Sequence, residues 1–465
     1  MPAGESSIII VGDMTDEVMQ MITLPQGAAF VVRRLTDAGY QAYVVGGCVR
    51  DSLLGIEPKD WDVCTSATPE EMQMVFRGCH VVETGLKHGT LTVMVDHVPY
   101  EATTFRVDGE YTDHRHPDEV IFVTDVREDL ARRDFTVNAM AYHPDTGVVD
   151  AFGGQEDLRA GIIRCVGEAQ TRFGEDALRI LRALRFASVY GFAIEEDTAR
   201  AVHALKHTLC GVAAERIRSE MGKLLCGRDA GRILREYHDV ITEILPELKP
   251  MVGFDQKTKW HLYDVWEHTV RTVENAPAEE TLRWAALLHD CGKPACFTVD
   301  EQGVGHSRGH QEKGGAMARE VMLKLRVDNA SRDRVTLLTA RHDAELCADK
   351  TVLRHALHDF GEEALRQLLL LQRADELSKG TLEEREVNAC FDGIEAALDG
   401  LLEENPCVTL RQLAVNGGDL MASGLPKGRA VGRCLNLLLE GVMDGRWPNE
   451  RPALLEAAKG MAKEL

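Results

Sequence analysis

The chain has 465 residues, of which 44% are hydrophobic, and carries a formal net charge of −22. A chain of this length is too long to bury one continuous core, so we expect about three domains. The hydrophobic fraction is ordinary for a globular protein, and no run of 18 apolar residues occurs, which excludes a transmembrane helix.

Two further features of the sequence indicate a cytoplasmic protein. The twelve cysteines are scattered without a Cys-x-x-Cys pair, which fits reduced thiols better than a disulfide framework. No basic segment precedes the apolar stretch SSIIIVG and acidic residues follow it, so a secretory signal is not expected. We therefore expect a cytoplasmic protein without membrane contact, in which residues 1–25 form an N-terminal extension.

The stretch YVVGGCVRDSLLGIEPKDWDVCT, residues 43–65, carries the strongest chemical signal in the chain. Its apolar start predicts a buried strand, which ends at Gly46 and Gly47 before a helix. Two glycines let a backbone approach a triphosphate closely, and Arg50 just beyond them can meet its negative charge. This turn is therefore a candidate phosphate-binding element.

Two aspartates follow on the next predicted strand, residues 59–63. Alternation along a strand places Asp60 and Asp62 on the same face. Two carboxylates so close together repel each other unless a cation lies between them, and oxygen ligands that leave room for phosphate favour Mg²⁺. A solvated aspartate pair after a loop is the alternative, but the Gly-Gly-x-x-Arg segment upstream favours a nucleotidyl-transfer centre.

These residues carry a resemblance to a known family. The pattern GGCVRDSLLG followed by KDWDVCTSATPEEM is similar to the head of the tRNA nucleotidyltransferase and poly(A) polymerase family, within the DNA polymerase β superfamily. The resemblance implies an α+β fold, with a small polymerase-β-like sheet domain followed by an all-α neck, an HD-type helical domain and a helical tail. It also implies addition of CCA to the 3′ end of tRNA.

The stretch GLKHGTLTVMVDHVPYEATTFR, residues 85–106, predicts two strands joined by a turn. Glu101 lies on the return strand, from which the superfamily takes a third carboxylate, so the resemblance implies that Glu101 completes the Mg²⁺ site. A surface glutamate on an edge strand is the alternative.

Lys87 and His88 resemble a signature that poly(A) polymerases of the family tend to lack. Residues 108–119 resemble the flexible loop that CC-adding members lack.

The motif LARRDFTVNAMAY is assigned to the nucleotide by the resemblance. Family members contact the nucleotide with the second arginine, which implies this role for Arg133, and Asp134 and Asn138 are implied at the ribose. An ordinary charged helix N-terminus is the alternative. We expect the sheet domain to close here, so that residues 26–156 form the nucleotidyltransferase head.

The segment TRFGEDALRILRALRFASVYGF, residues 171–192, predicts one amphipathic helix. Its largely apolar stripe recurs at helical spacing, at Ala177, Leu181, Leu184 and Ser188.

Although the whole chain is acidic, residues 157–235 hold 14 Lys and Arg against 10 Asp and Glu, a local net charge of +4. Local potential governs where a phosphate backbone docks, so the predicted neck, residues 157–250, indicates a selective RNA partner.

The charged residues of this helix match a family motif, Glu-Asp-x-x-Arg, at Glu175, Asp176 and Arg179. A carboxylate accepts a hydrogen bond from the amino group of cytosine, and a guanidinium donates to ring acceptors. Cytosine and adenine satisfy both groups, whereas uracil and guanine present a carbonyl to the carboxylate. We therefore predict that the protein itself selects the base, with Arg182 and Arg185 nearer the phosphates or the closing loop.

A new helical domain, residues 251–382, is predicted downstream of Pro250. It resembles the HD superfamily of metal-dependent phosphohydrolases. The resemblance implies a transition-metal site (Ni²⁺, Co²⁺ or Mn²⁺) with ligands at His268, His289, Asp290 and Asp375. Two-metal members of the superfamily place further ligands at positions that correspond to His310 and His342. An HD fold that serves only as a scaffold for tRNA is the alternative.

The remaining residues, 383–465, predict a helical tail. Its glycine- and lysine-containing turn, residues 424–428, precedes a helix and can bind backbone phosphate of the acceptor/TΨC arm of tRNA. We therefore predict an enzyme that adds CCA to tRNA from CTP and ATP and releases pyrophosphate, with a second metal centre downstream. The alternatives are a poly(A) polymerase, an A-adding tRNA nucleotidyltransferase, a non-catalytic RNA-binding scaffold, and an enzyme whose main activity is phosphohydrolysis.

Overall fold

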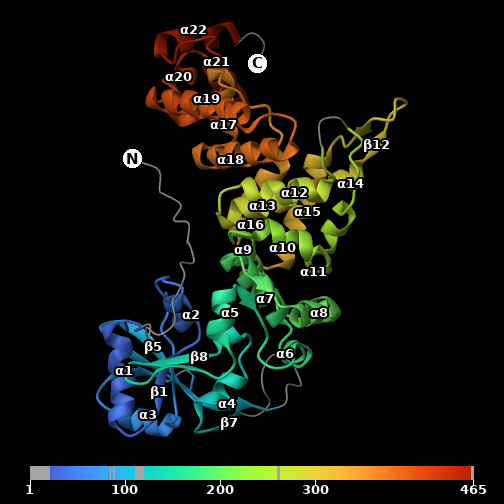
Figure 1. Cartoon of the computed structure of the whole chain (residues 1–465). Helices are drawn as coiled ribbons and strands as arrows, with labels where there is room; N and C mark the ends of the chain where they lie inside the picture. The colour runs from blue at the N-terminus through green and yellow to red at the C-terminus, as the bar shows by residue number, and fades with distance from the viewer. Residues whose placement is uncertain (1–20, 84, 87–88, 110–119, 259–261, 462–465) are drawn as a thin grey trace. The chain divides into compact units, whose positions relative to one another are not determined.

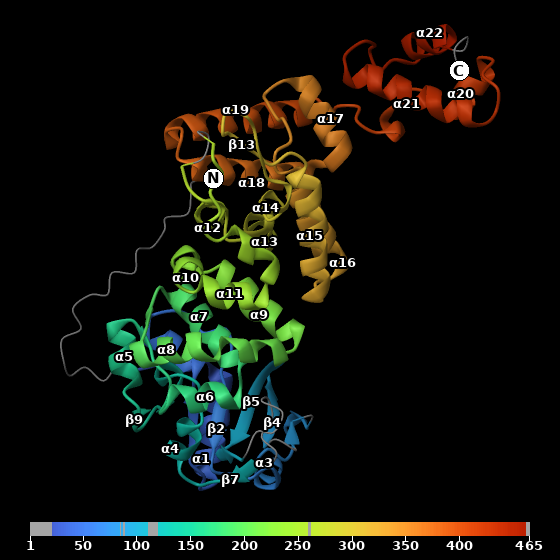
Figure 2. The same cartoon turned by 90° about the vertical axis from the view of Figure 1, so that its right-hand side faces the viewer.

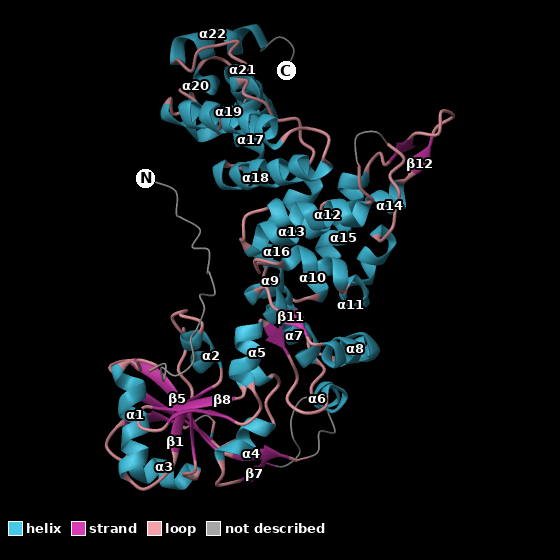
Figure 3. Cartoon of the chain, viewed as in Figure 1, coloured by secondary structure: helices cyan, strands magenta, loops and turns pink. Residues whose placement is uncertain are grey.

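A computed structural model describes residues 21–83, 85–86, 89–109, 120–258 and 262–461. Lys87, His88 and most of the predicted loop, residues 108–119, lie outside this part of the chain. The chain divides after Ile244 into two compact units, called unit 1 and unit 2 (Figures 1 and 2). Strands gather in unit 1, whereas unit 2 is built mainly of helices (Figure 3). The predicted α+β class is confirmed.

Unit 1 contains a seven-stranded sheet with the order β3-β4-β5-β2-β1-β8-β9. Strands β2 and β5 are parallel, and the other neighbours are antiparallel. The strands are β1 Ala42–Val45, β2 Val63–Thr65, β3 His80–Val82, β4 Thr90–Val95, β5 Val98–Thr104, β8 Met140–His143 and β9 Gly147–Asp150. Strands β6 Arg106–Asp108 and β7 Val120–Phe122 pair separately.

Helices cover the sheet on both faces. Helix α1 (Gln26–Asp37) lies on the face to which Tyr100 points, because Gly27 packs directly against the Tyr100 ring. Helix α3 (Pro69–Val75) begins with Thr68 as a capping residue and proline in the first turn. On the other face, α4 (Val126–Ala131) packs with Val45, Cys64 and Phe105 in one apolar cluster.

The predicted strand over residues 59–63 is wrong in position, because β2 begins only at Val63. Strand β1 ends at Val45, and the chain turns away at Gly46, where φ is +81°. Residues 59–61 therefore have no neighbouring strand to pair with. The last ladder bond runs from the Val45 amide to the Asp62 carbonyl at 2.9 Å, so the ladder ends at Asp62.

The single helix predicted over residues 171–192 is also wrong, since two helices occur, α6 (Ala169–Glu175) and α7 (Leu178–Tyr190). Asp176 lies extended between them, with φ −140° and ψ 104°. Its Oδ1 accepts a hydrogen bond from the Leu178 amide at 3.0 Å. An aspartate side chain that bonds to its local backbone competes with the helix, and apolar periodicity does not register this bond.

The rest of unit 1 is helical and packs around α7. Ser188 of α7 donates to the Leu224 carbonyl of α9 at 2.7 Å, and Gly227 lies directly against Ser188. The remaining elements are α2 Gly47–Leu53, α5 Gly154–Ala160, α8 Glu196–Leu205, α9 Ala214–Leu225, α10 Ala230–Glu236, α11 His238–Ile244 and the short paired strands β10 Ile162–Ile163 and β11 Ala193–Ile194.

Unit 2 holds the remaining helices and one small hairpin, β12 Thr298–Val299 with β13 Gly305–His306. No helix in the described part of the chain combines the length and the apolar character needed to cross a bilayer. The helices are α12 Val265–Asn275, α13 Glu280–Leu288, α14 Lys293–Cys296, α15 His310–Lys324, α16 Asn329–Arg341, α17 Lys350–Phe360, α18 Glu362–Lys379, α19 Glu384–Glu403, α20 Gly417–Ala422, α21 Arg429–Met443 and α22 Arg451–Met461.

The division after Ile244 lies close to the predicted boundary at residue 250. The finer division into head, neck, HD domain and tail stays a prediction. The predicted glycine-rich turn, residues 424–428, lies between α20 and α21.

We predict that Gly227→Ala destabilises unit 1. A Cβ at this position would lie 2.1 Å from the Ser188 Oγ and 2.7 Å from its carbonyl carbon, so α7 and the end of α9 would have to move apart. Overpacking of this kind lowers the free energy of unfolding by about 1–3 kcal/mol. Gly174→Ala is the matched control, because no other side chain lies within 4 Å of its added Cβ. Equal urea midpoints for both variants would contradict the prediction.

Candidate active site and metal centre

The three predicted catalytic carboxylates lie together at the parallel pair of strands. Val63 of β2 pairs with Ala102 of β5, so the preceding residues, Asp62 and Glu101, lie side by side. Asp60, Asp62 and Glu101 are all exposed. Desolvation by nearby protein atoms and the charges of Glu101 and Asp60 raise the pKa of the Asp62 carboxyl. Like charges held this close have this effect, and a divalent cation would relieve it.

Arg133 approaches the same carboxylates across the Gly46 turn. A Cβ at Gly46 would lie 2.8 Å from Nη1 of Arg133, which would have to shift, and the positive φ at this position favours glycine. Nη2 of Arg133 donates to Asp129 Oδ2 at 3.2 Å. The Arg133 charge opposes the rise in the pKa of Asp62, which places the guanidinium within electrostatic reach of the carboxylates.

Arg50, which we predicted to meet a triphosphate, lies in a buried network. Its residue is only 6% exposed, and its guanidinium carbon lies 4.8 Å from the Tyr190 ring centroid and 5.0 Å from that of Phe186. It pairs with Asp51 at 2.8 Å, and its Nη1 donates to Asn138 Oδ1. Arg50 therefore joins α2 to α7, and its contact with phosphate stays a prediction.

The network continues through Asp134, one of the residues predicted at the ribose. Its Oδ1 accepts from Asn138 Nδ2 at 3.0 Å, and its Oδ2 accepts from Arg182 Nε at 2.7 Å. Although burial opposes ionisation, Arg182 and Asn138 lower the pKa of Asp134 to about 2. A permanently charged Asp134 thus holds both residues in place.

Arg179 of the Glu-Asp-x-x-Arg motif is fixed near the start of α7. Its Nη1 pairs with Glu175 and also donates to the Arg172 carbonyl at 3.0 Å. Its Nη2 donates to the Arg132 carbonyl at 3.1 Å. These contacts use three of the five guanidinium hydrogens, so among the described residues the Nε–H and one Nη2 hydrogen are left for a ligand.

Asp176 is fixed by a residue that the sequence analysis did not assign. Nη2 of Arg216 lies 2.7 Å from Asp176 Oδ2, and Nη1 lies 3.3 Å from Oδ1. Together with the Leu178 amide, these donors occupy three of the roughly four acceptor positions of a carboxylate. Arg216 lies on α9, forty residues further along the chain, and a pairing between segments so far apart leaves no periodic signal in the sequence.

A cleft of about 1030 Å³ in unit 1 is lined by Arg50, Asp60 and Asp62, but not by Glu101, Arg133, Asp176 or Arg179. Arg185 lies on its wall and pairs with Glu220 at 2.6 Å. The head contributes Gly47, Asp60 and Asp62 to the lining, and the helical part contributes Arg185, Lys223 and Arg228. A cleft with carboxylates on one wall and cations on the other suits a metal ion together with a polyphosphate.

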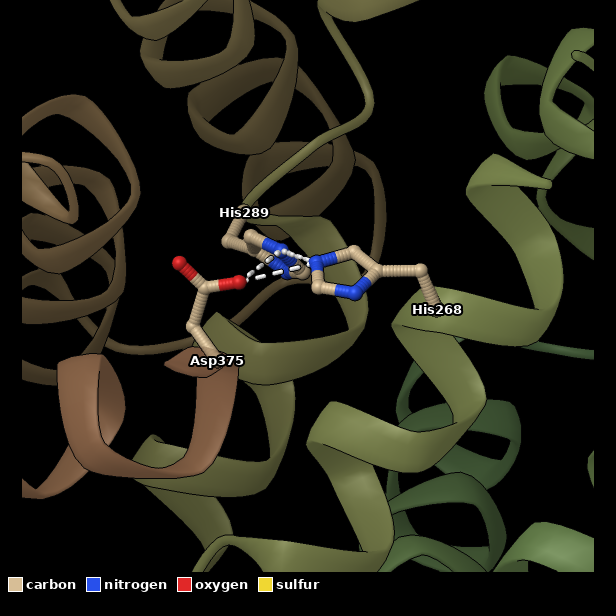
Figure 4. A group of neighbouring side chains, drawn as sticks. All are labelled: His268, His289 and Asp375. Atoms are coloured by element: carbon tan, nitrogen blue, oxygen red, sulfur yellow. Dashed lines mark hydrogen bonds and ion pairs between the residues drawn. The ribbon is translucent and has the colours of Figure 1, made fainter. Parts of the chain in front are cut away.

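In unit 2, all six predicted metal ligands converge. His268 comes from α12, His289 and Asp290 follow α13, His310 begins α15, His342 follows α16, and Asp375 lies on α18. They form two groups of three, and within each group the ligand atoms lie within 4.8 Å of one another. Figure 4 shows the first group, and the two groups are His268, His289 and Asp375, and Asp290, His310 and His342.

The histidine rings are oriented for metal binding. The Nδ1 atoms of His289, His310 and His342 each lie 2.8 Å from a backbone carbonyl oxygen three residues earlier. A ring that donates its Nδ1–H in this way presents a lone pair at Nε2. The Nε2 atoms of His310 and His342 lie only 3.3 Å apart, so two lone pairs face each other. A metal cation between them fits this arrangement.

Asp290 lies between the two groups. Its Oδ2 lies 3.2 Å from Nε2 of His289 and 3.5 Å from Nε2 of His268. Its Oδ1 lies 3.5 Å from Nε2 of His310 and 3.6 Å from Nε2 of His342. A carboxylate that offers one oxygen to each group can bridge two ions.

Both aspartates of the cluster are ionised, and Asp290 is buried whereas Asp375 is partly buried. Burial opposes ionisation of Asp290, but His289 and Lys293 hold its pKa well below the usual value, and the Lys293 Nζ lies 2.6 Å from Oδ2. Burial likewise opposes ionisation of Asp375, and its hydrogen bond with His268 keeps the pKa well below the usual range. Imidazole nitrogens with ionised carboxylates are a donor set that transition metals prefer.

Three family models match successive parts of the chain. The poly A polymerase head domain matches residues 42–164, and the Probable RNA and SrmB-binding site of polymerase A matches residues 191–252. The tRNA nucleotidyltransferase domain 2 matches residues 312–458. The first match contains the carboxylates, the Gly46 turn and Arg133.

Similar proteins cover nearly the whole chain. The CCA-adding enzyme of Limosilactobacillus fermentum is 33% identical over 454 residues, which is 96% of this chain and 100% of that protein. The CCA-adding enzyme of Levilactobacillus brevis is 33% identical over 442 residues, 94% of this chain and 99% of its own. The crystal structure of the Bacillus stearothermophilus CCA-adding enzyme in complex with CTP superposes with a TM-score of 0.70, at 30% identity, and covers 95% of this chain and 99% of its own.

We predict that Asp290→Asn lowers the metal content at both groups of ligands. The bridging carboxylate is shared, and an amide carries no charge to offset the ions, so a content of about two ions per chain should fall below one. Elemental analysis after loading with Mn²⁺ measures this. Asp359→Asn, an exposed aspartate on α17, is the control. Unchanged metal content in Asp290→Asn would exclude a shared ligand.

Proposed function

This chain belongs to the family of CCA-adding enzymes and is a nucleotidyltransferase, and from that premise we propose that it adds CCA to the 3′ end of tRNA. It uses CTP and ATP without a nucleic-acid template and releases pyrophosphate. The observation that carries this proposal is the register of β2 and β5, which sets Asp62 beside Glu101 at a cleft whose other wall is basic.

The carboxylates and the Gly46 turn have different roles in nucleotide transfer. Asp60, Asp62 and Glu101 would hold Mg²⁺, which when bound would lower the pKa of the tRNA 3′-hydroxyl, so that it loses its proton to solvent, and would offset charge on the departing pyrophosphate. Gly46 lets the backbone approach the triphosphate, and Arg133 meets its charge. The 3′ oxygen bonds to the α-phosphorus while the bond from that phosphorus to the pyrophosphate oxygen breaks.

The choice of base rests on Asp176 and Arg179. The described contacts leave one acceptor position on Asp176 and two donors on Arg179. Cytosine and adenine each offer an amino donor beside a ring acceptor, which matches this pair. Uracil and guanine place a carbonyl against the carboxylate, which repels it. Because Arg216 and two backbone carbonyls hold the pair in place, the protein surface acts in place of a template.

The alternatives within the same chemistry are a poly(A) polymerase and an A-adding tRNA nucleotidyltransferase. Purified protein is incubated with tRNA that ends at the discriminator base, at CC or at CCA, with labelled CTP or ATP. A CCA-adding enzyme extends the first tRNA by three nucleotides and stops. Extension of the CC-ending tRNA alone would indicate an A-adding enzyme, and long A tracts would indicate a poly(A) polymerase.

For unit 2 we propose metal-dependent phosphoester hydrolysis as a second activity. It is favoured by the opposed Nε2 atoms of His310 and His342 and by the bridging position of Asp290. Ni²⁺, Co²⁺ or Mn²⁺ held there would lower the pKa of bound water and polarise a phosphoryl oxygen. A 2′,3′-cyclic phosphate at a damaged tRNA end is the proposed substrate class.

We predict that Asp62→Asn lowers nucleotide addition by at least about 10³-fold, because one neutral ligand weakens charge stabilisation by several kcal/mol. Binding of tRNA, measured by filter retention, should stay within about threefold, since the RNA contacts lie on cations elsewhere. Asp96→Asn, in the exposed turn between β4 and β5, is the matched control. Addition rates of Asp62→Asn close to those of Asp96→Asn would refute the metal assignment.

We predict that Asp176→Asn changes selection more than rate. The amide offers a donor where the carboxylate offered an acceptor, so O4 of uracil gains a partner. The preference for CTP over UTP should fall by about 10–100-fold, the worth of one base contact. Asp197→Asn, an exposed aspartate on α8, is the control. Single-nucleotide incorporation from each of the four triphosphates measures the ratio, and an unchanged ratio would exclude base reading by Asp176.

A further inference from the structure

A pocket of about 280 Å³ opens beside the metal cluster of unit 2. One of its walls belongs to the cluster itself, because His310 lines the pocket and Lys293, also on the wall, contacts Asp290 at 2.6 Å. The β12–β13 hairpin also lines the pocket, through His306 and, just after the hairpin, Arg308. With Lys293 and Arg308 present, a phosphoester that reaches the cluster through this pocket meets two cations.

The hairpin wall is rigid where it meets the pocket. Asp300 Oδ1 accepts from the amides of Gln302 at 3.0 Å and Val304 at 2.9 Å, which fixes the turn. The amide of Gly305 donates to the Lys257 carbonyl at 2.8 Å. A Cβ at Gly305 would lie 2.2 Å from the Gln256 carbonyl oxygen, so the strand packs directly against the main chain.

His306 and Asp300 form a pair on this wall. Nε2 of His306 lies 2.8 Å from Asp300 Oδ2. If the ring donates its Nε2–H to this carboxylate, the other nitrogen, Nδ1, is the one available to a ligand. A histidine oriented by a carboxylate is the arrangement that general acids and bases share. The His306 side chain keeps 38% exposure, so solvent can return a proton to it.

We propose that His306, oriented by Asp300, is the proton donor for the leaving oxygen in phosphoester hydrolysis at the cluster of unit 2. This inference rests on the second activity proposed above. Water forms a bond to phosphorus and loses one proton to solvent, and the ester bond from phosphorus to the ribose oxygen breaks. The departing oxygen takes the Nδ1 proton of the doubly protonated His306 ring, whose Nε2–H stays with Asp300, and becomes a hydroxyl, and Nδ1 regains a proton from solvent.

If His306 is the proton donor, its loss should affect substrates differently, depending on whether their leaving group needs a proton. In 2′,3′-cyclic AMP the leaving oxygen is a ribose alkoxide that requires a proton, whereas bis(4-nitrophenyl) phosphate releases a nitrophenolate that does not. His306→Ala should lower hydrolysis of the cyclic nucleotide by about 10²–10⁴-fold, the usual share of general acid catalysis, and change the nitrophenyl substrate by less than about fivefold. Asp300→Asn should show a smaller loss of the same kind.

His355→Ala is the matched control, because the Nε2 of His355 also lies 2.8 Å from a carboxylate, that of Asp444, and the side chain has the same 38% exposure. It should leave both substrates unchanged. A second readout needs no turnover: binding of adenosine 3′-monophosphate by calorimetry should stay within about threefold in His306→Ala, since proton transfer contributes only in the transition state.

The outcomes distinguish the two proposals. If the wild type hydrolyses both substrates but His306→Ala loses both equally or neither, His306 is not the proton donor, and the hydrolase remains. If adenosine 3′-monophosphate binding collapses in His306→Ala, the residue shapes the pocket and the proposal is wrong. If the wild type hydrolyses neither substrate with Mn²⁺, Ni²⁺ or Co²⁺, the second activity fails and the role of His306 fails with it.

Discussion

The parallel pairing of β2 with β5 is the constraint on which the nucleotidyl-transfer site depends. All other neighbours in the sheet are antiparallel, and in this parallel register the residues that precede Val63 and Ala102, Asp62 and Glu101, lie side by side although they are far apart in sequence. The two carboxylates repel each other, and this repulsion disfavours the folded state. The contacts of β4, α1 and α4 with the two strands offset it and hold the strands in place. Ligand positions fixed in advance are what a hard cation such as Mg²⁺ requires.

The second centre obtains its rigidity in another way. Its proposed ligands lie on or directly after five helices, and three of the rings are held by carbonyl oxygens of the backbone three residues earlier. The last carbonyl groups of a helix have no hydrogen-bond partner within the helix. A histidine placed there donates its Nδ1–H to such a carbonyl oxygen, and the same bond fixes the orientation of the ring. His289 and His342 stand directly after α13 and α16, where this applies.

Residue type and strand spacing allowed Asp60 and Asp62 to be proposed, whereas Glu101 and the six metal ligands of unit 2 were proposed from the family resemblance. The sequence did not reveal what lies between elements. Asp176 breaks its helix through a bond to the Leu178 amide, and Arg216 reaches it from α9, so neither fact has a period in the sequence. The strand start at Val63 was misplaced for a similar reason, since it depends on where β1 turns away.

Arg50, Asn138, Asp134 and Arg182 form one buried chain of hydrogen bonds that ties the sheet to α7. Two of these residues, Asp134 and Asn138, are also those assigned to the ribose. A substitution at Asp134 or Asn138 that changes nucleotide binding would also change the stability of the contact between the sheet and α7. These four hydrogen-bonded residues should therefore change slowly in evolution. A tolerated substitution at one of them should be accompanied by a compensating substitution at another.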